Sequence, residues 1–407
     1  MRRRILIVGG GYAGALCANR LARKTDPTRT EIVLADPRPW FIDRIRLHEH
    51  VAGRTRAPRS RASMVDPRVV LRTGRVTELD LGARRAVVDG ASGGMVGCAP
   101  TSEAFDELIV ATGSTRPRRC IPGIEHAWSC ATAEDAAALR AHLDTASVTR
   151  VLVIGGGLTG IELAGELAAA RPLSVTLVAA EGVGALLSNE ARASVRGALE
   201  ALGVALYEHV RIAAIEEDGV VLATGDALAA DTVVWCGGFE AATLARESGL
   251  VVDELGRAVV DERLRSTSHD FVRVIGDAAH VPCRRRDGSV TPLRMGCVSA
   301  MPMGAYAADD LAAALGDRVA PGPFSFGYLI QCISIGRRSG IVQHVDPYDV
   351  ATPHHLGGRL GAWGKELICR LALASIKFER HGIGYVWPRG PALPGSTADP
   401  MLASRHT

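Results

Sequence analysis

One internal repeat constrains the fold of this chain more than any other feature of its sequence. Residues 4–22, RILIVGGGYAGALCANRLA, occur again at 150–168 as RVLVIGGGLTGIELAGELA, with an offset of 146 throughout. Each copy reads as an apolar strand, a glycine turn and the start of a helix, which is how a βαβ unit opens. The repeat therefore predicts two α/β domains of one kind.

Both copies contain the pattern G-x-G-x-x-G, which has a physical role. The first glycine makes the tight turn, the second lets the backbone approach a pyrophosphate, and the third lets the helix pack on the strand. The anion then lies at the helix N-terminus, where free N–H groups and the dipole favour it. A turn that merely packs tightly would explain one copy better than two. The predicted dinucleotide-binding glycines are Gly9, Gly11 and Gly14, and then Gly155, Gly157 and Gly160.

The residues that end the second strand of each unit differ between the copies. In the first copy the strand ends at Asp36, 22 residues past Gly14, close to where a carboxylate holds adenosine ribose hydroxyls. In the second copy Ala179 occupies the acidic position. The two sites are therefore predicted to hold different dinucleotides, or to hold them differently.

Composition and charge exclude several other classes of protein. The chain has 407 residues with 47 basic and 44 acidic side chains, and its net charge is +3. No basic block indicates nucleic-acid binding, and we expect no nucleic-acid partner. The 9 cysteines form no CxxC pair, which favours a reducing cytoplasm over a disulfide framework. The 12 histidines show no metal-ligand spacing, so no metal site is predicted.

Further segments resemble the pyridine-nucleotide flavoprotein oxidoreductases, in the branch near type II NADH dehydrogenases and apoptosis-inducing factor. Residues 105–114, FDELIVATGS, resemble the crossing from the FAD domain into the NAD(P)H domain, and 233–238, VVWCGG, the crossing back. Residues 271–277, FVRVIGD, resemble the second FAD motif, and 74–80 the strand that flanks the adenine. The resemblance implies cofactor contacts from Val76, Ala111, Thr112, Gly113, Gly237, Gly276 and Asp277.

The sequence differs from related enzymes in its cysteines, and this difference limits the reactions that we expect. Disulfide reductases of this superfamily carry paired cysteines after the Asp36 strand or in the NADPH domain, and this chain has neither pair. Thiol exchange needs a thiolate beside the flavin, so disulfide reduction is close to excluded. The resemblance then implies that electrons leave the flavin for a diffusible acceptor, most simply a quinone.

The segment 40–53 resembles the one that type II enzymes run past the flavin ring. Arg46, His48 and Glu49 are thus candidates for flavin or acceptor contacts, with His48 and Glu49 as candidate catalytic residues. Imidazole titrates near neutral pH, which suits proton donation to a quinol. A solvated helix of mixed charge is an equally good interpretation of the same residues.

Two other positions are implied by the resemblance. Glu162, two residues past Gly160, matches a glutamate that faces nicotinamide and flavin in related enzymes; its alternative role is to complement the helix dipole. Residues 294–304 resemble the start of a helix that points at the flavin, with the helix itself expected from Ala305 to Leu315. Ala300 and Met301 stand where type II enzymes often have an Ala-Gln pair near the quinone, which leaves the acceptor open.

The C-terminal part carries strand-like stretches, a Gly- and His-rich loop at 351–362 and an amphipathic helix at about 363–380. The helix, which carries a stripe of apolar residues, either packs on its own domain or lies on an anionic membrane, as type II enzymes use this segment. The stripe consists of Trp363, Leu367, Leu371, Ala374 and Phe378.

Together these features predict an α/β protein with two Rossmann-like three-layer domains and a small C-terminal α+β domain. FAD is assigned to 1–114 plus 241–318, NAD(P)H to 115–240, and the C-terminal domain to 319–407. The predicted activity is an FAD-dependent NAD(P)H dehydrogenase, leaning to NADH, with a quinone-type acceptor, in the cytoplasm or peripheral on the inner membrane face. The alternatives are a soluble FAD oxidoreductase of a biosynthetic or electron-carrier pathway, and a slow NADH-binding redox sensor.

Overall fold

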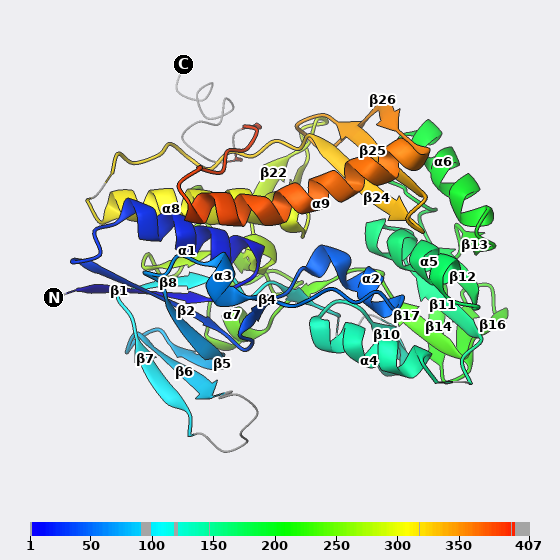
Figure 1. The fold of residues 1–407 in the computed structure, drawn as a ribbon, viewed down its shortest axis with the longest axis horizontal. Coiled ribbons are helices and arrows are strands. Elements are labelled where there is room, and N and C mark those ends of the chain that lie inside the picture. The colour runs from blue at the N-terminus through cyan, green and yellow to red at the C-terminus, as the bar shows by residue number, and fades with distance from the viewer. Residues whose placement is uncertain are drawn as a thin grey trace.

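The structure is a computed structural model that describes residues 2–90, 99–117, 121–145, 147–316, 318–391 and 393–394. Figure 1 shows two sheet-and-helix units side by side, with the long helix α9 (Gly358–Arg380) extending from one toward the other. The end of the predicted C-terminal domain, 395–407, lies outside the described residues.

The first unit is built on a seven-stranded sheet with the order β20-β8-β1-β2-β5-β6-β7. Its strands from β20 to β5 pair in parallel, and β6 and β7 are added antiparallel. Residues 5–8 of β1 are all buried because helices and loops cover both faces, which explains the continuous apolar run. The strands are β1 (Arg3–Val8), β2 (Thr30–Asp36), β5 (Val70–Asp80), β6 (Arg85–Gly90), β7 (Thr101–Ala104), β8 (Glu107–Val110) and β20 (Val272–Val274).

Three helices lie together above this sheet: α1 (Tyr12–Lys24), α8 (Cys297–Ala314) and the end of α9 (Figure 1). The helix expected from Ala305 begins eight residues earlier and contains Pro302. Gly304 lies inside this helix and has a packing role. A Cβ at this position would collide with the Ala13 carbonyl of α1. Close packing of α1 on α8 therefore outweighs the low helix propensity of these residues.

The second unit contains a five-stranded parallel sheet in the order β10-β17-β11-β12-β13 and a three-stranded antiparallel sheet, β14-β15-β16. The helix α5 (Leu158–Ala170) follows the second glycine turn. The other elements are α4 (Ala133–Leu143), α6 (Asn189–Glu200), β10 (Trp128–Ser129), β11 (Arg150–Ile154), β12 (Ser174–Ala179), β13 (Ala205–Glu208), β14 (Ile212–Glu216), β15 (Gly219–Leu222), β16 (Ala227–Ala229) and β17 (Thr232–Trp235).

The C-terminal part is an antiparallel sheet, β24 (Ile330–Ile335), β25 (Ser339–Val345) and β26 (Ala351–Leu356), with α9 packed on it. The prediction of a loop at 351–362 is therefore wrong, because these residues form β26 and the first turn of α9. The early start of α9 has a packing reason, since a Cβ at Gly361 would collide with the Gly340 carbonyl of β25.

The helix α9 does not pack through the apolar stripe that its sequence offers. Trp363, Leu367, Leu371 and Phe378 are 67%, 40%, 50% and 44% exposed, whereas Cys369, Leu373 and Ile376 are buried. The helix does pack on its own domain, as one of the two interpretations has it, but through a face other than the stripe.

Short elements complete the chain and form the connections around the sheets. They are β3 (Trp40–Phe41), η1 (Arg44–Arg46), α2 (Leu47–Val51), β4 (Arg59–Ser60), α3 (Arg61–Met64), β9 (Ser114–Thr115), η2 (Ile124–His126), β18 (Glu240–Ala241), α7 (Leu244–Glu247), β19 (Ala258–Val259), η3 (Gly276–Ala278), β21 (Ala279–His280), β22 (Pro282–Arg284) and β23 (Val290–Pro292).

Candidate active site

The first glycine turn joins β1 to α1 in the form that a dinucleotide requires. Gly9 has φ +102°, a conformation that favours glycine, and a Cβ on Gly14 would collide with the Gly9 carbonyl. A Cβ on Gly11 would meet nothing within 4 Å, so the backbone at the start of α1 is open to a ligand. The turn therefore fits a pyrophosphate, with the N-terminus of α1 facing it.

Asp36, at the end of β2, lies beside this turn. Its Oδ2 accepts a hydrogen bond from the Gly10 backbone N–H at 2.8 Å, and its Oδ1 is 2.7 Å from Nη2 of Arg61. The strand thus brings the predicted ribose carboxylate to the glycine turn. Arg61, which the sequence analysis did not single out, also donates to the Gly10 carbonyl.

The other predicted FAD contacts gather around Asp277. Its carboxylate accepts hydrogen bonds from Ser114 Oγ at 2.6 Å and from the Gly296 backbone at 2.8 Å. Thr112, two residues before Ser114, has a buried hydroxyl with no hydrogen-bond partner in the described part of the chain. An unpartnered polar atom beside two loops and a helix start fits a polar cofactor such as FAD.

The remaining predicted FAD residues lie on several elements of the first unit. Ala111 and Gly113 flank Thr112, and Gly276 begins η3. Val76 is buried in β5, and Ala300 and Met301 are buried in the first turns of α8. Their contacts with FAD stay predictions.

The second glycine turn repeats the geometry of the first. Gly155 has φ +123°, a Cβ on Gly160 would collide with the Gly155 carbonyl, and a Cβ on Gly157 would meet nothing within 4 Å. Gly237 follows β17 beside this turn, since a Cβ on Gly155 would come within 2.9 Å of its nitrogen. This turn therefore also fits a dinucleotide pyrophosphate.

The region where the adenosine ribose would lie differs from that of the first turn. Ala179 places only a methyl group beside Gly156, so no carboxylate takes the position that Asp36 has. Arg192 comes from α6 to within 2.8 Å of a Cβ position on Gly182, and its Nε is buried without a hydrogen-bond partner. No local sequence pattern points to this cation, because α6 is distant in sequence from the glycine turn.

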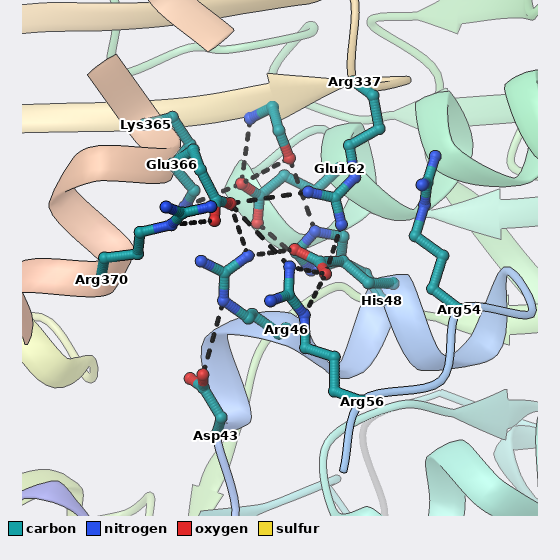
Figure 2. A network of polar contacts seen from close by, with 12 residues as sticks. Asp43, Arg46, His48, Arg54, Arg56, Glu162, Arg337, Lys365, Glu366 and Arg370 are labelled. Carbon is teal, nitrogen blue, oxygen red and sulfur yellow. Dashed lines mark hydrogen bonds and ion pairs between the residues drawn. The ribbon is translucent and has the colours of Figure 1, made fainter. Parts of the chain in front are cut away.

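A buried charge cluster lies where α2, α5, β24 and α9 meet, and Glu162 of α5 is at its centre (Figure 2). Glu162 Oε1 is 2.9 Å from Nζ of Lys365 and accepts the Ser334 backbone N–H at 3.0 Å. Its Oε2 is 3.6 Å from Nδ1 of His48. The side chains of Glu162 and His48 are 8% and 4% exposed, so both groups are removed from water.

Burial and charge act against each other on these groups. Burial alone raises the pKa of Glu162, but Lys365 and His48 outweigh it and hold that pKa below its usual value. Burial alone lowers the pKa of Lys365, but its contact with Glu162 outweighs this and raises the pKa well above its usual value. Burial also lowers the pKa of His48, since the attraction of Glu162 only partly offsets it. Near neutral pH the cluster therefore holds an ionised Glu162–Lys365 pair beside an uncharged imidazole.

Glu49 has a different environment from the one that a catalytic role would predict. Burial raises its pKa, but Arg46, Arg337 and Arg56 outweigh burial and keep Glu49 ionised, with the pKa below its usual value. Arg46 Nη1 lies 2.7 Å from Glu49 Oε1, and Arg337 and Arg56 both contact Oε2. A carboxylate held by three guanidinium groups orients them better than it exchanges protons, so its catalytic role stays a prediction.

The segment 44–51 is not a solvated helix. Arg46, His48 and Glu49 are 6%, 4% and 5% exposed, and α2 packs on α4 and α5. The structure therefore contradicts the solvated alternative and brings these residues to Glu162.

A cavity of about 300 Å³ opens beside the cluster, between β24, β25 and α9. Ser334 and Lys365, which both contact Glu162, lie on its wall. The other lining residues are Arg46, Glu49, Arg337, Arg338, Arg359, Ala362, Trp363, Glu366 and Cys369.

Lys365 and Ser334 were missed because they reach the site only through the tertiary fold. One signal was present in the sequence: Lys365 stands four residues before Cys369 and eight before Leu373, on the face of α9 that is buried. A lysine on an apolar helix face needs a buried partner. The chain has only 3 lysines, which makes this position more distinctive.

The chain contains two dinucleotide turns, a carboxylate two residues past the second turn, and a cavity of about 300 Å³ beside that carboxylate. This combination defines a flavoprotein oxidoreductase of the two-dinucleotide class. Across the described residues no group of three or more His, Cys, Asp or Glu side chains is arranged to hold a metal ion. A family model for pyridine nucleotide-disulphide oxidoreductases matches residues 3–304. The chain belongs to this family, and its members bind FAD and a pyridine nucleotide.

Curated relatives carry NADH dehydrogenase names. The chain is 31% identical over 337 residues to the NADH dehydrogenase-like protein MT1860 of Mycobacterium tuberculosis (strain CDC 1551 / Oshkosh), covering 75% of this chain and 78% of that protein. It is 25% identical over 425 residues to the type II NADH:quinone oxidoreductase of Staphylococcus haemolyticus (strain JCSC1435), covering 96% and 98%. The predicted resemblance to type II NADH dehydrogenases is confirmed.

Solved structures agree on the fold. NDH2 from Plasmodium falciparum in complex with NADH gives a TM-score of 0.73 at 12% identity, covering 96% of this chain and 100% of that one. The sulfide:quinone oxidoreductase of Aquifex aeolicus gives 0.72 at 16% identity, covering 93% and 92%. The predicted Rossmann-like α/β fold is thus confirmed.

Proposed function

We propose that this chain is an NADH dehydrogenase that oxidises NADH through FAD and delivers two electrons to a quinone-type acceptor. The observation that carries the proposal is the buried Glu162–Lys365 pair, because it joins the helix of the second glycine turn to the wall of an open cavity. Pyridine nucleotide and acceptor would thereby meet at one buried charge cluster. The names of the relatives support the same activity.

The residues of the first unit would hold FAD. The open backbone at Gly11 would take the pyrophosphate, Asp36 the adenosine ribose, and Asp277 the polar chain near the flavin. Bound FAD supplies the hydride acceptor and the two-electron store. The protein contributes alignment, and burial of the cluster keeps bulk water away from the reacting groups.

NADH delivers a hydride, which carries two electrons and one proton, so reduction of a quinone to a quinol takes up one further proton. Lys365 Nζ, ion-paired with Glu162 on the cavity wall, would give that proton to the reduced acceptor oxygen, which is a stronger base than the quinone carbonyl. The charge of Glu162 would favour replacement of this proton from the cavity. His48, uncharged near neutral pH, faces Glu162 Oε2 through Nδ1 and would relay the replacement proton between its two ring nitrogens.

Acceptor-dependent kinetics of Glu162→Gln test this function. We expect kcat/KM for menadione to fall about a hundredfold, within the range of general acid–base effects. Reduction of ferricyanide, which takes up no proton, should fall much less. Equal losses with both acceptors would contradict the proton role. Turnover of the unaltered enzyme below about one per second with every acceptor, the lower end of ordinary enzymes, would favour the redox-sensor alternative.

The coenzyme is proposed to be NADH, with modest discrimination. Glu181 would repel a 2′-phosphate, although Arg211 pairs with it at 3.1 Å. Ala179 offers neither NADH nor NADPH a partner, and Arg192 near Gly182 would favour a 2′-phosphate. These opposed contributions support acceptance of both coenzymes, with the relatives' names favouring NADH.

The exposed stripe of α9 supports a peripheral position on the inner membrane face. No helix in the described ranges is long and apolar enough to span a bilayer. A truncation before Trp363 would also remove Lys365, so substitution is the cleaner test. Trp363→Ser with Leu371→Ser should reduce co-flotation with phosphatidylglycerol vesicles while ferricyanide reduction stays unchanged. Undiminished flotation would favour the soluble electron-carrier alternative.

A further inference from the structure

The cavity beside Lys365 combines the apolar surface that is usual for small-molecule sites with a set of charged side chains. Five cationic and two anionic side chains line the wall together with Ala362, Trp363 and Cys369. Lys365 is paired with Glu162, and Arg46 and Arg337 are paired with carboxylates as well. Any attraction for anions therefore comes from the other two cations, Arg338 and Arg359.

The anionic residues of the wall are already neutralised by arginines. Glu366 contacts Arg46 at 2.8 Å and Arg370 at 2.7 Å. Burial raises the pKa of Glu366, but the hydrogen bonds from these two arginines outweigh it and lower that pKa to about 2. Glu49 is held by Arg46 and Arg337. Neither carboxylate is thus free to balance further cations.

Two cations of the cavity remain without such a partner. Arg338, in the turn between β24 and β25, and Arg359, in the first turn of α9, make no ion pair or side-chain hydrogen bond with any residue in the described ranges. Both are exposed, whereas Ser334 is 9% exposed and the Lys365 side chain 12%. The cavity therefore runs from two unpaired guanidinium groups at its mouth to the proton-holding cluster at its inner end.

Taking the proposed function as the basis, we propose that the acceptor is an anionic quinonoid molecule, whose carboxylate, sulfonate or phosphate is held by Arg338 and Arg359. A guanidinium fork binds such groups through two parallel hydrogen bonds. The ring of the acceptor lies along Trp363 and reaches Lys365 with its carbonyl oxygen. Reduction adds two electrons and two protons to the ring, and the anionic group takes no part in the chemistry.

Variants of the FAD-loaded enzyme test the assignment. Arg338→Gln, Arg359→Gln and the double variant are compared with Arg85→Gln, which removes the same charge from an exposed site on β6. We expect KM for naphthoquinone sulfonate to rise about fivefold in each single variant and more than twentyfold in the double variant. KM for uncharged naphthoquinone should stay within twofold, and Arg85→Gln should change neither. Equal changes for both quinones, or none for the sulfonate, would overturn the proposal.

Direct binding separates this proposal from the proposed function. Quenching of tryptophan fluorescence by the sulfonate, measured without NADH, should show the same weakening in the double variant. If no quinone is reduced but this weakening is found, the quinone reductase function fails and the anion site stands. If quinone reduction is intact and the binding is unchanged, the anion site alone fails. Loss of binding to phosphatidylglycerol vesicles with unchanged sulfonate KM would assign the two arginines to a lipid surface, and would also overturn the proposal.

Discussion

Replacement of Lys365 by methionine should expose how strongly the buried cluster depends on its one lysine. Methionine keeps the length and apolar character of the side chain but removes the charge that lies 2.9 Å from Glu162. Removing one partner of a buried ion pair typically costs about 3–5 kcal/mol. The Ser334 backbone N–H still reaches Glu162, which favours the lower end of that range.

The structure also sets an upper limit to this loss. Instead of staying charged, Glu162 can take up a proton, and from its usual pKa of 4.5 this costs about 3.4 kcal/mol at pH 7 and about 0.7 kcal/mol at pH 5. In the unaltered protein the pKa of Glu162 is lowered, so its contribution to stability is present above pH 4.5 and lost only below it. We therefore expect Lys365→Met to cost about 3 kcal/mol at pH 7 and about 1 kcal/mol at pH 5.

Urea unfolding of the FAD-loaded protein, followed by tryptophan fluorescence, measures this difference as a shift of the midpoint at constant slope. Lys377→Met on the same helix is the matched control and should change stability by less than about 0.5 kcal/mol. Adding Glu162→Gln to Lys365→Met removes the orphaned charge and should restore at least half of the loss. A loss below about 1 kcal/mol at pH 7, or a double variant no better than the single one, would refute the reasoning.

Three further outcomes are expected. Asp36→Ala should weaken FAD binding by about 1.5–3 kcal/mol, since it removes charge-assisted hydrogen bonds and leaves Arg61 unpaired; titration of the apoprotein with FAD measures this, and an unchanged affinity would place the ribose elsewhere. Because burial lowers the pKa of His48 below 6.5, the unfolded chain binds a proton that the folded chain does not. Stability should thus fall as pH drops below about 6.5, and His48→Gln should flatten that slope in urea midpoints. Arg192→Ala should lower kcat/KM for NADPH at least fivefold more than for NADH, whereas a hundredfold preference of the unaltered enzyme for NADPH would contradict the NADH assignment.

The features that the sequence predicted well are those whose physics is local. Each glycine turn needs only its neighbouring strand and helix to define it, so Gly9, Gly11 and their counterparts in the repeat identified two Rossmann units. The cluster around Glu162 is different, because Ser334 and Lys365 reach it from 172 and 203 positions away. No local sequence pattern indicates that Ser334 and Lys365 lie beside Glu162.

The helix errors have a similar origin. The glycines near the starts of α8 and α9 reduce helix propensity, so both helices were predicted to begin after these glycines. In the structure Gly304 and Gly361 allow backbones to approach each other, an advantage that appears only when the neighbouring element is in place. α9 also carries apolar residues on two faces, and periodicity alone does not tell which one is buried.

The pairing of α1 with α9 bears on the order in which the protein folds. Arg20 of α1 donates to Glu379 of α9 at 2.9–3.0 Å, and Asn19 donates to the Ile376 carbonyl, across more than 350 residues of sequence. Contacts of such long sequence separation form late in folding. The helix that continues the first dinucleotide turn therefore gains its support from α9 only in a late step, and a folding intermediate without α9 would hold that helix less firmly.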